Sequence, residues 1–345
     1  MAKAEQSLAV KYRPQKFDDL TEQESIKTIL RHQLDTKTIK NCYLFVGPAG
    51  CGKTTSARIF ADEINDYHGN PIELDAASNN SVDDMRNIIK QAQTQSLDSE
   101  YKIFIIDEAH MITVQGWNAL LKLLEEPPAK SIFIFCTTDP NRIPKTILSR
   151  VQRYDFQRIS NKGIVDRLAY ILLEEGLRTR GSQEEPLAYI AKLADGGMRD
   201  AITLMDKCLS YSSELTVENV VKALGVTNYG FLFSLNDAIF SKNVHEVLKV
   251  VGEIHASGQD LKKFISTYVG FLLDICKYRI LKSFDYLILP STYSSFLDEY
   301  SDAEFDMCRD LLDYMLKLNN SLKYESKPKA VIEAMLLLYM SEDER

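Results

Sequence analysis

This chain is organised around the stretch Gly47-Pro48-Ala49-Gly50-Cys51-Gly52-Lys53-Thr54. A glycine, four residues and then Gly-Lys-Thr is the pattern of a P-loop. An apolar run at 42–46 precedes it, and a helical pattern at 55–61 follows it. Strand, glycine-rich turn and helix are the context that the motif requires. We therefore predict a site for nucleotide phosphates here, rather than a glycine-rich turn without a ligand.

The residue types at this stretch match the chemistry of phosphate binding. Glycines let backbone N–H groups approach phosphate oxygens without a Cβ atom in the way, and the start of a helix favours an anion. Lys53 is expected to reach the β- and γ-phosphates, and the Thr54 hydroxyl is expected to bind Mg²⁺. The expected nucleotide-binding set is Gly47, Gly50, Cys51, Gly52, Lys53, Thr54 and Thr55.

Composition describes an ordinary globular chain. Of its 345 residues 45% are hydrophobic and 26% are charged, and the net charge is −8. That charge argues against a protein coated in basic residues for nucleic acid, although it leaves room for a local basic face. No apolar run approaches the roughly 18 residues of a spanning helix, and no signal peptide is indicated. We expect a cytoplasmic protein without a membrane contact.

Two further apolar runs predict buried parallel strands whose ends carry polar residues. The run at 102–106 ends at Asp107-Glu108. Beside a P-loop, Asp107 is expected to hold Mg²⁺ through water, and Glu108 to polarise the attacking water. The run at 131–136 delivers Thr138 to the same edge of the sheet, because ligands bind at the carboxyl ends of strands in open α/β sheets. Taken alone, Thr138 is more typical of a turn.

Helical patterns fill the rest of the chain. They predict an α/β nucleotide-binding domain with a parallel sheet at 1–159, a small helical lid at 160–227 and an all-α domain at 228–345. Arg150 is one of several arginines near the end of the first domain, and such residues are usually surface charges. The segment around Tyr12-Arg13-Pro14 reads as extended, because Pro14 blocks a helix. It fits either a surface arm or a contact with a nucleotide base.

Several motifs together resemble one family. They run in the family's order from residue 11 to residue 201, and the chain resembles the bacterial DNA polymerase III gamma/tau subunits, the AAA+ ATPases of sliding-clamp loaders. Besides the P-loop, the matching stretches are Lys11-Tyr12-Arg13-Pro14, Asp75-Ala76-Ala77-Ser78-Asn79-Asn80, Ile106-Asp107-Glu108-Ala109-His110-Met111, the run from Asn118 to Pro128, Thr137-Thr138-Asp139-Pro140, Ile147-Leu148-Ser149-Arg150 and Gly196-Gly197-Met198-Arg199-Asp200-Ala201.

The resemblance implies roles that the residues alone leave open. Tyr12, Arg13 and Pro14 are implied to contact adenine, and Thr138 to be sensor 1. Arg150 is implied to be an arginine finger that acts on ATP held by a neighbouring subunit. Arg199 is implied to be sensor 2, which reaches from the lid to the γ-phosphate. The 228–345 domain is implied to be the collar that assembles the oligomer.

Three departures from the family matter. Val151 replaces the cysteine of the Ser-Arg-Cys motif. Only residues 62–70, without cysteine, stand where members usually carry a four-cysteine zinc module, so no zinc is predicted. The long C-terminal extension of the family's longer form is missing, which implies a short, loader-only subunit. In addition, Glu22 stands where the family commonly has glycine.

The partners follow from the resemblance as well. We expect a sliding clamp, primer–template DNA bound without sequence preference, and other loader subunits in a homo- or hetero-oligomer, expected to be pentameric. Clamp-loader subunits touch DNA phosphates through helix N-termini. The matching positions here are Asn79, Asn80, Ser81, Arg86 and Gln115.

Three functions remain open at this point. The first is an ATP-hydrolysing motor subunit of a clamp loader, which uses ATP and Mg²⁺. The second is a structural loader subunit that lends Arg150 but does not turn over ATP. The third is another AAA+ DNA motor, for branch migration or helicase loading. The complete set of Lys53, Thr54, Asp107 and Glu108 favours the first.

Overall fold

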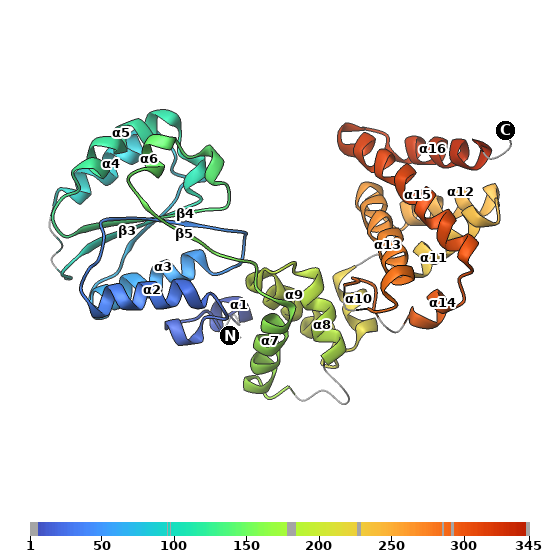
Figure 1. The fold of residues 1–345 in the computed structure, drawn as a ribbon, viewed down its shortest axis with the longest axis horizontal. Helices are drawn as coiled ribbons and strands as arrows, with labels where there is room; N and C mark the ends of the chain where they lie inside the picture. The colour runs from blue at the N-terminus through green and yellow to red at the C-terminus, as the bar shows by residue number, and fades with distance from the viewer. Residues whose placement is uncertain are drawn as a thin grey trace, which may run out of the picture. The chain divides into compact units, whose positions relative to one another are not determined.

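The computed structural model describes residues 6–94, 96, 98–177, 184–225, 229–284, 286–290 and 293–342. The chain divides into two compact units (Figure 1). The nucleotide unit comprises Met1–Arg178 and Ile190–Asp206, and the collar unit comprises Thr179–Tyr189 and Lys207–Arg345. The predicted boundaries at 159 and 227 remain a prediction.

A five-stranded parallel sheet forms the centre of the nucleotide unit. Its order is β2-β3-β4-β1-β5, and the strands are β1 (Cys42–Val46), β2 (Ile72–Asp75), β3 (Lys102–Asp107), β4 (Ser131–Thr137) and β5 (Gln152–Asp155). Val46 pairs with Thr137, and Asp75 pairs with Asp107. The carboxyl ends of the strands therefore meet at one edge, which is where an open α/β sheet binds ligands.

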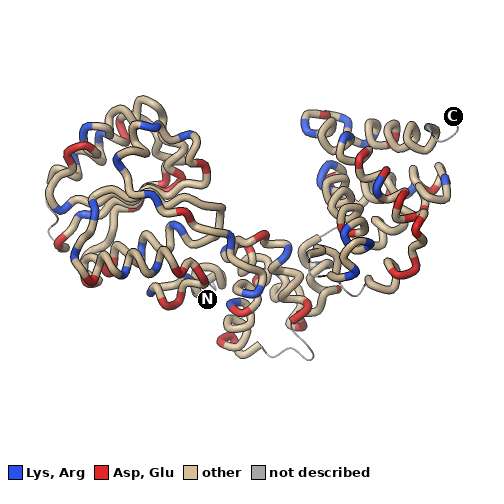
Figure 2. Tube along the Cα trace, viewed as in Figure 1, with Lys and Arg blue, Asp and Glu red and all other residues tan. Residues whose placement is uncertain are grey.

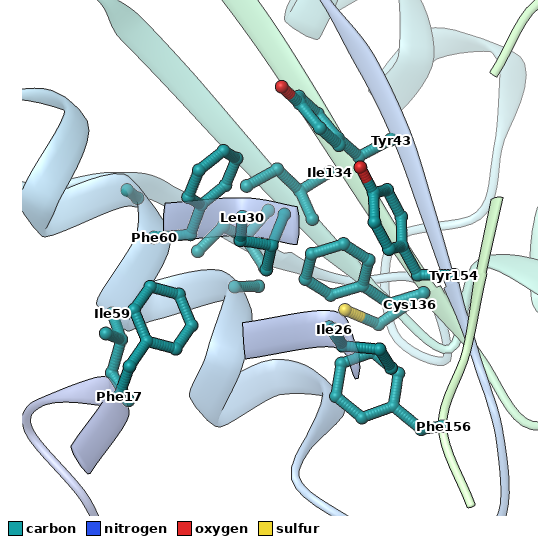
Figure 3. Packing of buried hydrophobic residues seen from close by; sticks show 14 of the residues in the cluster. Phe17, Ile26, Leu30, Tyr43, Ile59, Phe60, Ile134, Cys136, Tyr154 and Phe156 are labelled. Atoms are coloured by element: carbon teal, nitrogen blue, oxygen red, sulfur yellow. The ribbon is translucent and has the colours of Figure 1, made fainter. Parts of the chain in front are cut away.

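Alternate residues of each strand face opposite layers of helices, so both faces of the sheet are buried. Tyr43 and Phe45 belong to the core cluster with α2 (Glu24–Asp35) and α3 (Lys53–Ile64), part of which Figure 3 shows. Leu44 and Val46 face the second cluster, with α4 (Val82–Ala92), α5 (Val114–Glu125) and α6 (Lys145–Leu148). The predicted α/β fold is confirmed.

The other elements are helical. The nucleotide unit also contains α1 (Leu8–Lys11), η1 (Phe17–Asp19), η2 (Ala109–Met111), η3 (Pro140–Arg142) and α7 (Asn161–Glu174). The helices α8 (Glu184–Leu193) and α9 (Met198–Tyr211) each contribute residues to both units. The collar unit contains α10 (Val217–Leu224), α11 (Tyr229–Phe240), α12 (Val244–Ala256), α13 (Leu261–Leu281), α14 (Ser294–Asp298), α15 (Asp302–Ser321), η5 (Leu322–Tyr324) and α16 (Pro328–Glu342).

The structure differs from the sequence pattern in three places. The edge strand β5 was not predicted, because Tyr154 is its single buried residue and gives no apolar run. The N-terminal segment contains the short helix α1, which ends at Lys11, three residues before the proline. The periodicity of α2 predicts Ile29 on its inner face, but this side chain is 44% exposed, because Ile26 and Leu30 already fill the contact with the core.

Charge and hydropathy agree with a folded chain of mixed surface. Basic and acidic residues are interspersed along both units (Figure 2). Within the described ranges, no helix is long and apolar enough to span a bilayer.

Candidate nucleotide site

The P-loop joins β1 to α3 and is shaped by its glycines. Gly50 has a φ of 71°, which favours glycine, and a Cβ there would lie only 3.0 Å from the Cα atom of Gly197. The N–H of Met198 donates to the carbonyl of Gly50 at 3.0 Å. The loop therefore packs directly on the Gly196-Gly197 turn at the start of α9, with no side chain between the two backbones.

Lys53 lies at the first position of α3 and is 6% exposed. Its Nζ donates to the carbonyl oxygens of Gly47, at 2.9 Å, and Pro48, at 2.7 Å. Two carbonyls of the loop thus hold the ammonium group at the start of the helix, where helix dipole and lysine both attract an anion.

A cavity of about 350 Å³ brings the predicted nucleotide contacts together, except Gly47, which is not among the residues that line it. Residues far apart in sequence line it, namely Tyr12, Arg13, Pro14, Gly50, Cys51, Gly52, Lys53, Thr54, Thr55, Asp107 and Arg199. Arg58 and Arg167 also line it and were missed. Arg58 follows Thr54 by one helical turn, a spacing that places it on the same side of α3. Arg167 has no signal in the sequence, because only the fold brings α7 to the cavity.

Asp107 is held from two sides at the end of β3. Its Oδ2 accepts a hydrogen bond from Thr54 Oγ1 at 2.8 Å, and its Oδ1 accepts one from the Glu108 N–H at 3.0 Å. A hydroxyl and a carboxylate lie side by side, and such oxygen donors suit a hard cation that keeps part of its water shell. These two residues therefore fit the Mg²⁺ that the sequence predicts here.

Glu108 has a left-handed backbone, with φ of 47°. A non-glycine residue in this region stores strain, which is common where a side chain has a chemical task. Its Oε2 accepts a hydrogen bond from Thr138 Oγ1 at 3.3 Å and lies 3.4 Å from His110 Nδ1. The predicted water-activating and sensor residues are therefore adjacent.

Arg150 follows α6 and is absent from the residues that line the cavity. Its Nη2 donates to Glu125 Oε1 at 2.6 Å, and its Nη1 donates to the carbonyl of Thr146 at 2.5 Å and to Ser149 Oγ at 3.1 Å. The guanidinium group is thus fixed away from the cavity of its own chain.

The segment before Pro14 is fastened to the lid helix α7. The Tyr12 hydroxyl donates to Glu175, which Lys11 also contacts at 2.6 Å, and Arg167 Nη2 donates to the Tyr12 carbonyl at 3.0 Å. Burial, and then the bond to Glu175, raise the pKa of Tyr12 to about 12. The hydrogen bonds from Lys11 and Tyr12 lower the pKa of Glu175. The tyrosine is therefore neutral and the carboxylate charged at neutral pH.

Glu22 has a φ of 56°, a backbone conformation that favours glycine, so the resemblance to a family that commonly has glycine there fits the local geometry. Its carboxylate accepts hydrogen bonds from the Ser160 hydroxyl and, at 3.1 Å, from the Ser160 N–H. The neighbouring Gln23 exchanges two hydrogen bonds with the backbone of Gln157, at 2.7 and 3.1 Å. The departure from glycine thus places an acidic side chain at the start of α7, where the helix dipole favours it.

The DNA candidates come from two neighbouring helix starts. The Thr113 N–H, at the start of α5, donates to the Asn80 carbonyl at 3.3 Å, next to the start of α4. Ser81 and Asp84 form a capping box, as the sequence pattern predicts. Arg86 pairs with Asp83 at 3.0 Å, and Gln115 lies in the first turn of α5. The fold therefore brings Asn79, Asn80, Ser81, Arg86 and Gln115 to one region.

The cysteines are all free thiols. Across the described residues, no three side chains of His, Cys, Asp or Glu gather in a way that could hold a metal ion. Where relatives are expected to carry a zinc module, the Asn65 side chain hydrogen bonds to both the N–H and the carbonyl of Tyr101, at 2.8 and 2.9 Å. These bonds join the end of α3 to the start of β3. The expectation that zinc is absent remains a prediction.

Comparison with known proteins covers most of the chain. Residues 72–160 match the family model for the DNA polymerase III delta subunit. Residues 163–214 match the ATPase lid domain of DNA polymerase III clamp loader subunits, and residues 215–340 match domain III of the gamma and tau subunits.

Full-length relatives agree with these models. The chain is 34% identical to the DNA polymerase III subunit tau of Bacillus subtilis over 355 residues, which cover 96% of this chain and 62% of that one. It is 30% identical to the subunit gamma of Buchnera aphidicola over 362 residues, which cover 97% and 99%. The chain therefore spans nearly all of one relative and about three fifths of the other.

Solved structures support the fold. The RuvB Holliday junction branch migration motor of Thermotoga maritima matches 65% of this chain and 79% of its own, with a TM-score of 0.53 and 20% identity. A likeness at that identity shows a shared fold and no more. The family models and the gamma relative, which the chain covers almost completely, are more specific. The chain belongs to the DNA polymerase III gamma/tau family of clamp-loader ATPase subunits.

Proposed function

We propose that this chain binds and hydrolyses ATP as a motor subunit of a sliding-clamp loader in DNA replication. One observation carries the proposal. Lys53, Thr54, Asp107 and Glu108 meet at one edge of the sheet, beside or lining the cavity of about 350 Å³. A structural subunit without turnover has no need of all four residues.

Each of these residues has a role that its geometry supports. Lys53 neutralises the β- and γ-phosphates, while the backbone of the loop holds them. Thr54 and Asp107 would hold Mg²⁺, which would stabilise the charge that develops on the phosphates. Glu108 orients a water molecule and accepts its proton. Arg199 lines the cavity from the start of α9, so the lid contacts the nucleotide of its own chain.

Arg150 acts in trans in this proposal. It is absent from its own cavity, and Glu125 fixes its guanidinium group. A neighbouring subunit would place its ATP against this arginine, which stabilises the transition-state charge and is worth about 10³–10⁵ in rate. Thr138, as sensor 1, reports the γ-phosphate to Glu108.

The assembled machine forms part of the same proposal. The collar unit joins this subunit to other loader subunits, in a homo- or hetero-oligomer that we expect to be a pentamer. ATP at the interfaces orders a partial ring that opens the clamp. Primer–template DNA, held through phosphates near Asn80 and Gln115, completes the geometry around Glu108. Hydrolysis then releases the closed clamp. The three-domain boundaries, the absence of zinc and a cytoplasmic location belong to this proposal too.

The decisive experiment measures ATP hydrolysis with and without primed DNA and a cognate clamp. We expect the two together to stimulate hydrolysis more than the sum of each alone, and Glu108→Gln to lower hydrolysis to a small residual rate while ATP still binds. Hydrolysis that neither addition changes would contradict the loader assignment. ATP-driven strand movement without a clamp would favour another AAA+ motor, and a complete lack of hydrolysis a structural subunit.

A further inference from the structure

Two consecutive threonines at the end of β4 hold Glu108 by different routes. Thr138 Oγ1 donates directly to Glu108 Oε2 at 3.3 Å. Thr137 acts through the imidazole of His110, because His110 Nδ1 lies 3.2 Å from Thr137 Oγ1 and 3.4 Å from the same Glu108 Oε2. Glu108 Oε2 is therefore contacted from two sides, by Thr138 and by His110.

The other carboxylate oxygen is available. None of the hydrogen bonds within the described part of the chain reaches Glu108 Oε1. A general base needs one oxygen oriented toward the water whose proton it accepts. The arrangement fixes Oε2 and thereby aims Oε1, so it suits a carboxylate that is held for a task.

The imidazole is itself held firmly. His110 lies in η2, which Glu108 precedes, and the neighbouring Ala109 is fully buried. Thr137 is fully buried as well, and its Oγ1 accepts a hydrogen bond from the Asp139 N–H at 3.1 Å. The His110 side chain is only 14% exposed. The ring therefore has little freedom to turn away from the carboxylate.

The neighbouring groups also decide which nitrogen of His110 carries hydrogen. A bare Nδ1 would turn its lone pair toward the carboxylate oxygen, which is repulsive, whereas Nδ1–H donates to it. With hydrogen on Nδ1, the ring donates to Glu108 Oε2 and Thr137 Oγ1 together. His110, which lies in η2, thus acts as a hydrogen-bond donor toward Glu108.

We propose that His110 is a positioning residue for Glu108, and that it sets the rate of hydrolysis without affecting nucleotide binding. The inference rests on the proposed function of Glu108 as the residue that activates water. It goes further, because it assigns a role to a histidine that neither touches the nucleotide cavity nor takes a proton from water. The loss of correct aim at a reacting atom costs about 10²-fold in rate.

The test compares single-turnover ATP hydrolysis by variants in the assembled loader with clamp and primed DNA. His110→Ala is expected to lower the rate constant about 100-fold while the dissociation constant for ATP stays unchanged. His68→Ala is the matched control, because His68 is exposed and lies in the same unit. A normal rate in His110→Ala would overturn the proposal.

Two longer variants separate positioning from packing. The amide nitrogen of His110→Asn reaches the place of Nδ1, and that of His110→Gln reaches the place of Nε2. We expect Asn to restore most of the rate and Gln to leave it low. If His110→Ala fails to fold, as read by the fluorescence of the single tryptophan, Trp117, this pair still decides the question. Equal rates in the two variants would contradict the role of Nδ1.

A double variant distinguishes this inference from the function on which it rests. In a Glu108→Gln background, adding His110→Ala is expected to cause no further loss, because His110 acts only through the carboxylate. Multiplied losses would show that His110 acts elsewhere, and the inference would fail. If Glu108→Gln alone hydrolyses ATP at the normal rate, the proposed function of Glu108 fails instead.

Discussion

Both units contain polar side chains that hydrogen bond to one another, but the two sets differ in burial and in their position within the secondary structure. In the nucleotide unit, Asp107 is the last residue of β3 and Glu108 follows it, and the Glu108 side chain is 40% exposed. In the collar unit, Asn236 and Tyr268 are fully buried within α11 and α13. The Tyr268 hydroxyl donates to Asn236 Oδ1 at 2.9 Å, and Asn236 Nδ2 donates to the Tyr300 hydroxyl at 3.0 Å.

The comparison shows what position in an element does to a polar group. At a strand end, a polar side chain retains free bonding capacity that faces a cavity, so a ligand can use it. In the middle of packed helices, the same capacity is used internally and stabilises one arrangement of the core. We therefore interpret the first set as a site and the second as structure, and the variants below test this division.

The largest expected effect belongs to Arg150. Arg150→Ala is expected to slow hydrolysis at least about 10³-fold in the assembled loader, because a trans arginine stabilises transition-state charge. ATP binding should persist. Arg142→Ala is the control, since Arg142 is exposed and pairs only with the neighbouring Asp139 among the described residues, at 3.3 Å. Hydrolysis at the normal rate in Arg150→Ala would make the trans assignment wrong.

Lys53 comes next. Lys53→Ala removes charge-assisted hydrogen bonds to phosphate, a loss of about 3 kcal/mol or about 100-fold in affinity. Titration with a fluorescent ATP analogue measures it. Lys130→Ala serves as the control, because Lys130 is exposed and lies at the opposite end of the sheet, before β4. Unchanged affinity for the ATP analogue in Lys53→Ala would contradict the assignment of the phosphate site to this loop.

The core under the site provides a stability test. Phe133→Ala deletes a buried ring that stacks on Phe104 at 5.0 Å, and is expected to lower the free energy of unfolding by about 3–5 kcal/mol. Trp117, the single tryptophan, is buried in the same cluster, so its fluorescence reports this unfolding. Tyr67→Ala, at a side chain that is 60% exposed, should change little.

The buried polar group of the collar should give a smaller effect. Tyr268→Phe removes one hydroxyl and leaves Asn236 Oδ1 without its donor, which costs about 1–3 kcal/mol of unfolding free energy. Helical circular dichroism during urea unfolding measures it, with Tyr286→Phe as the exposed control. A stability equal to the parent's would mean that the group does not hold the collar together. Hydrolysis that drops while stability holds would give it a functional role.

The smallest effect is a pH dependence in the collar. Asp274 is 2% exposed, and burial raises its pKa. Hydrogen bonds from the backbone N–H groups of Leu289 and Ile288, and the charge of Lys277, partly oppose this rise. The folded state then binds a proton more tightly than the unfolded state. This contribution to stability is therefore lost as pH rises from the unfolded pKa through the folded one. Asp274→Asn should flatten that dependence in acid unfolding curves, and an unchanged slope would contradict it.

Much of the nucleotide unit could be predicted from sequence because its signals are local. The P-loop, the apolar runs that form β1, β3 and β4, and the capping box at Ser81 each depend on neighbouring residues. The edge strand β5 lacks such a signal, because it contacts the sheet on one side and buries only Tyr154.

The site residues that sequence analysis missed were missed for a different reason. Arg167 lies on the lid helix α7 and Glu175 is the C-cap of that helix, and both come more than 150 positions after the Tyr12 that they contact. His110 gains its meaning only when β4 brings Thr137 beside it. Such contacts follow from topology, which spacing within one segment cannot reveal. The predicted roles of Arg150, Arg199 and Thr138 still depend on the resemblance, and Arg150→Ala tests the first of them.

The contact between Gly50 and Gly197 has a consequence for the whole assembly. Two backbones meet there with only hydrogen atoms between them, and Met198 is hydrogen bonded across the contact. Because the two backbones are in direct contact, we expect a shift in the phosphate-binding loop to displace the lid, and a shift in the lid to displace the loop. Because coupling between sites is reciprocal, we expect a partner that binds only the lid to change the affinity for ATP without contacting the nucleotide.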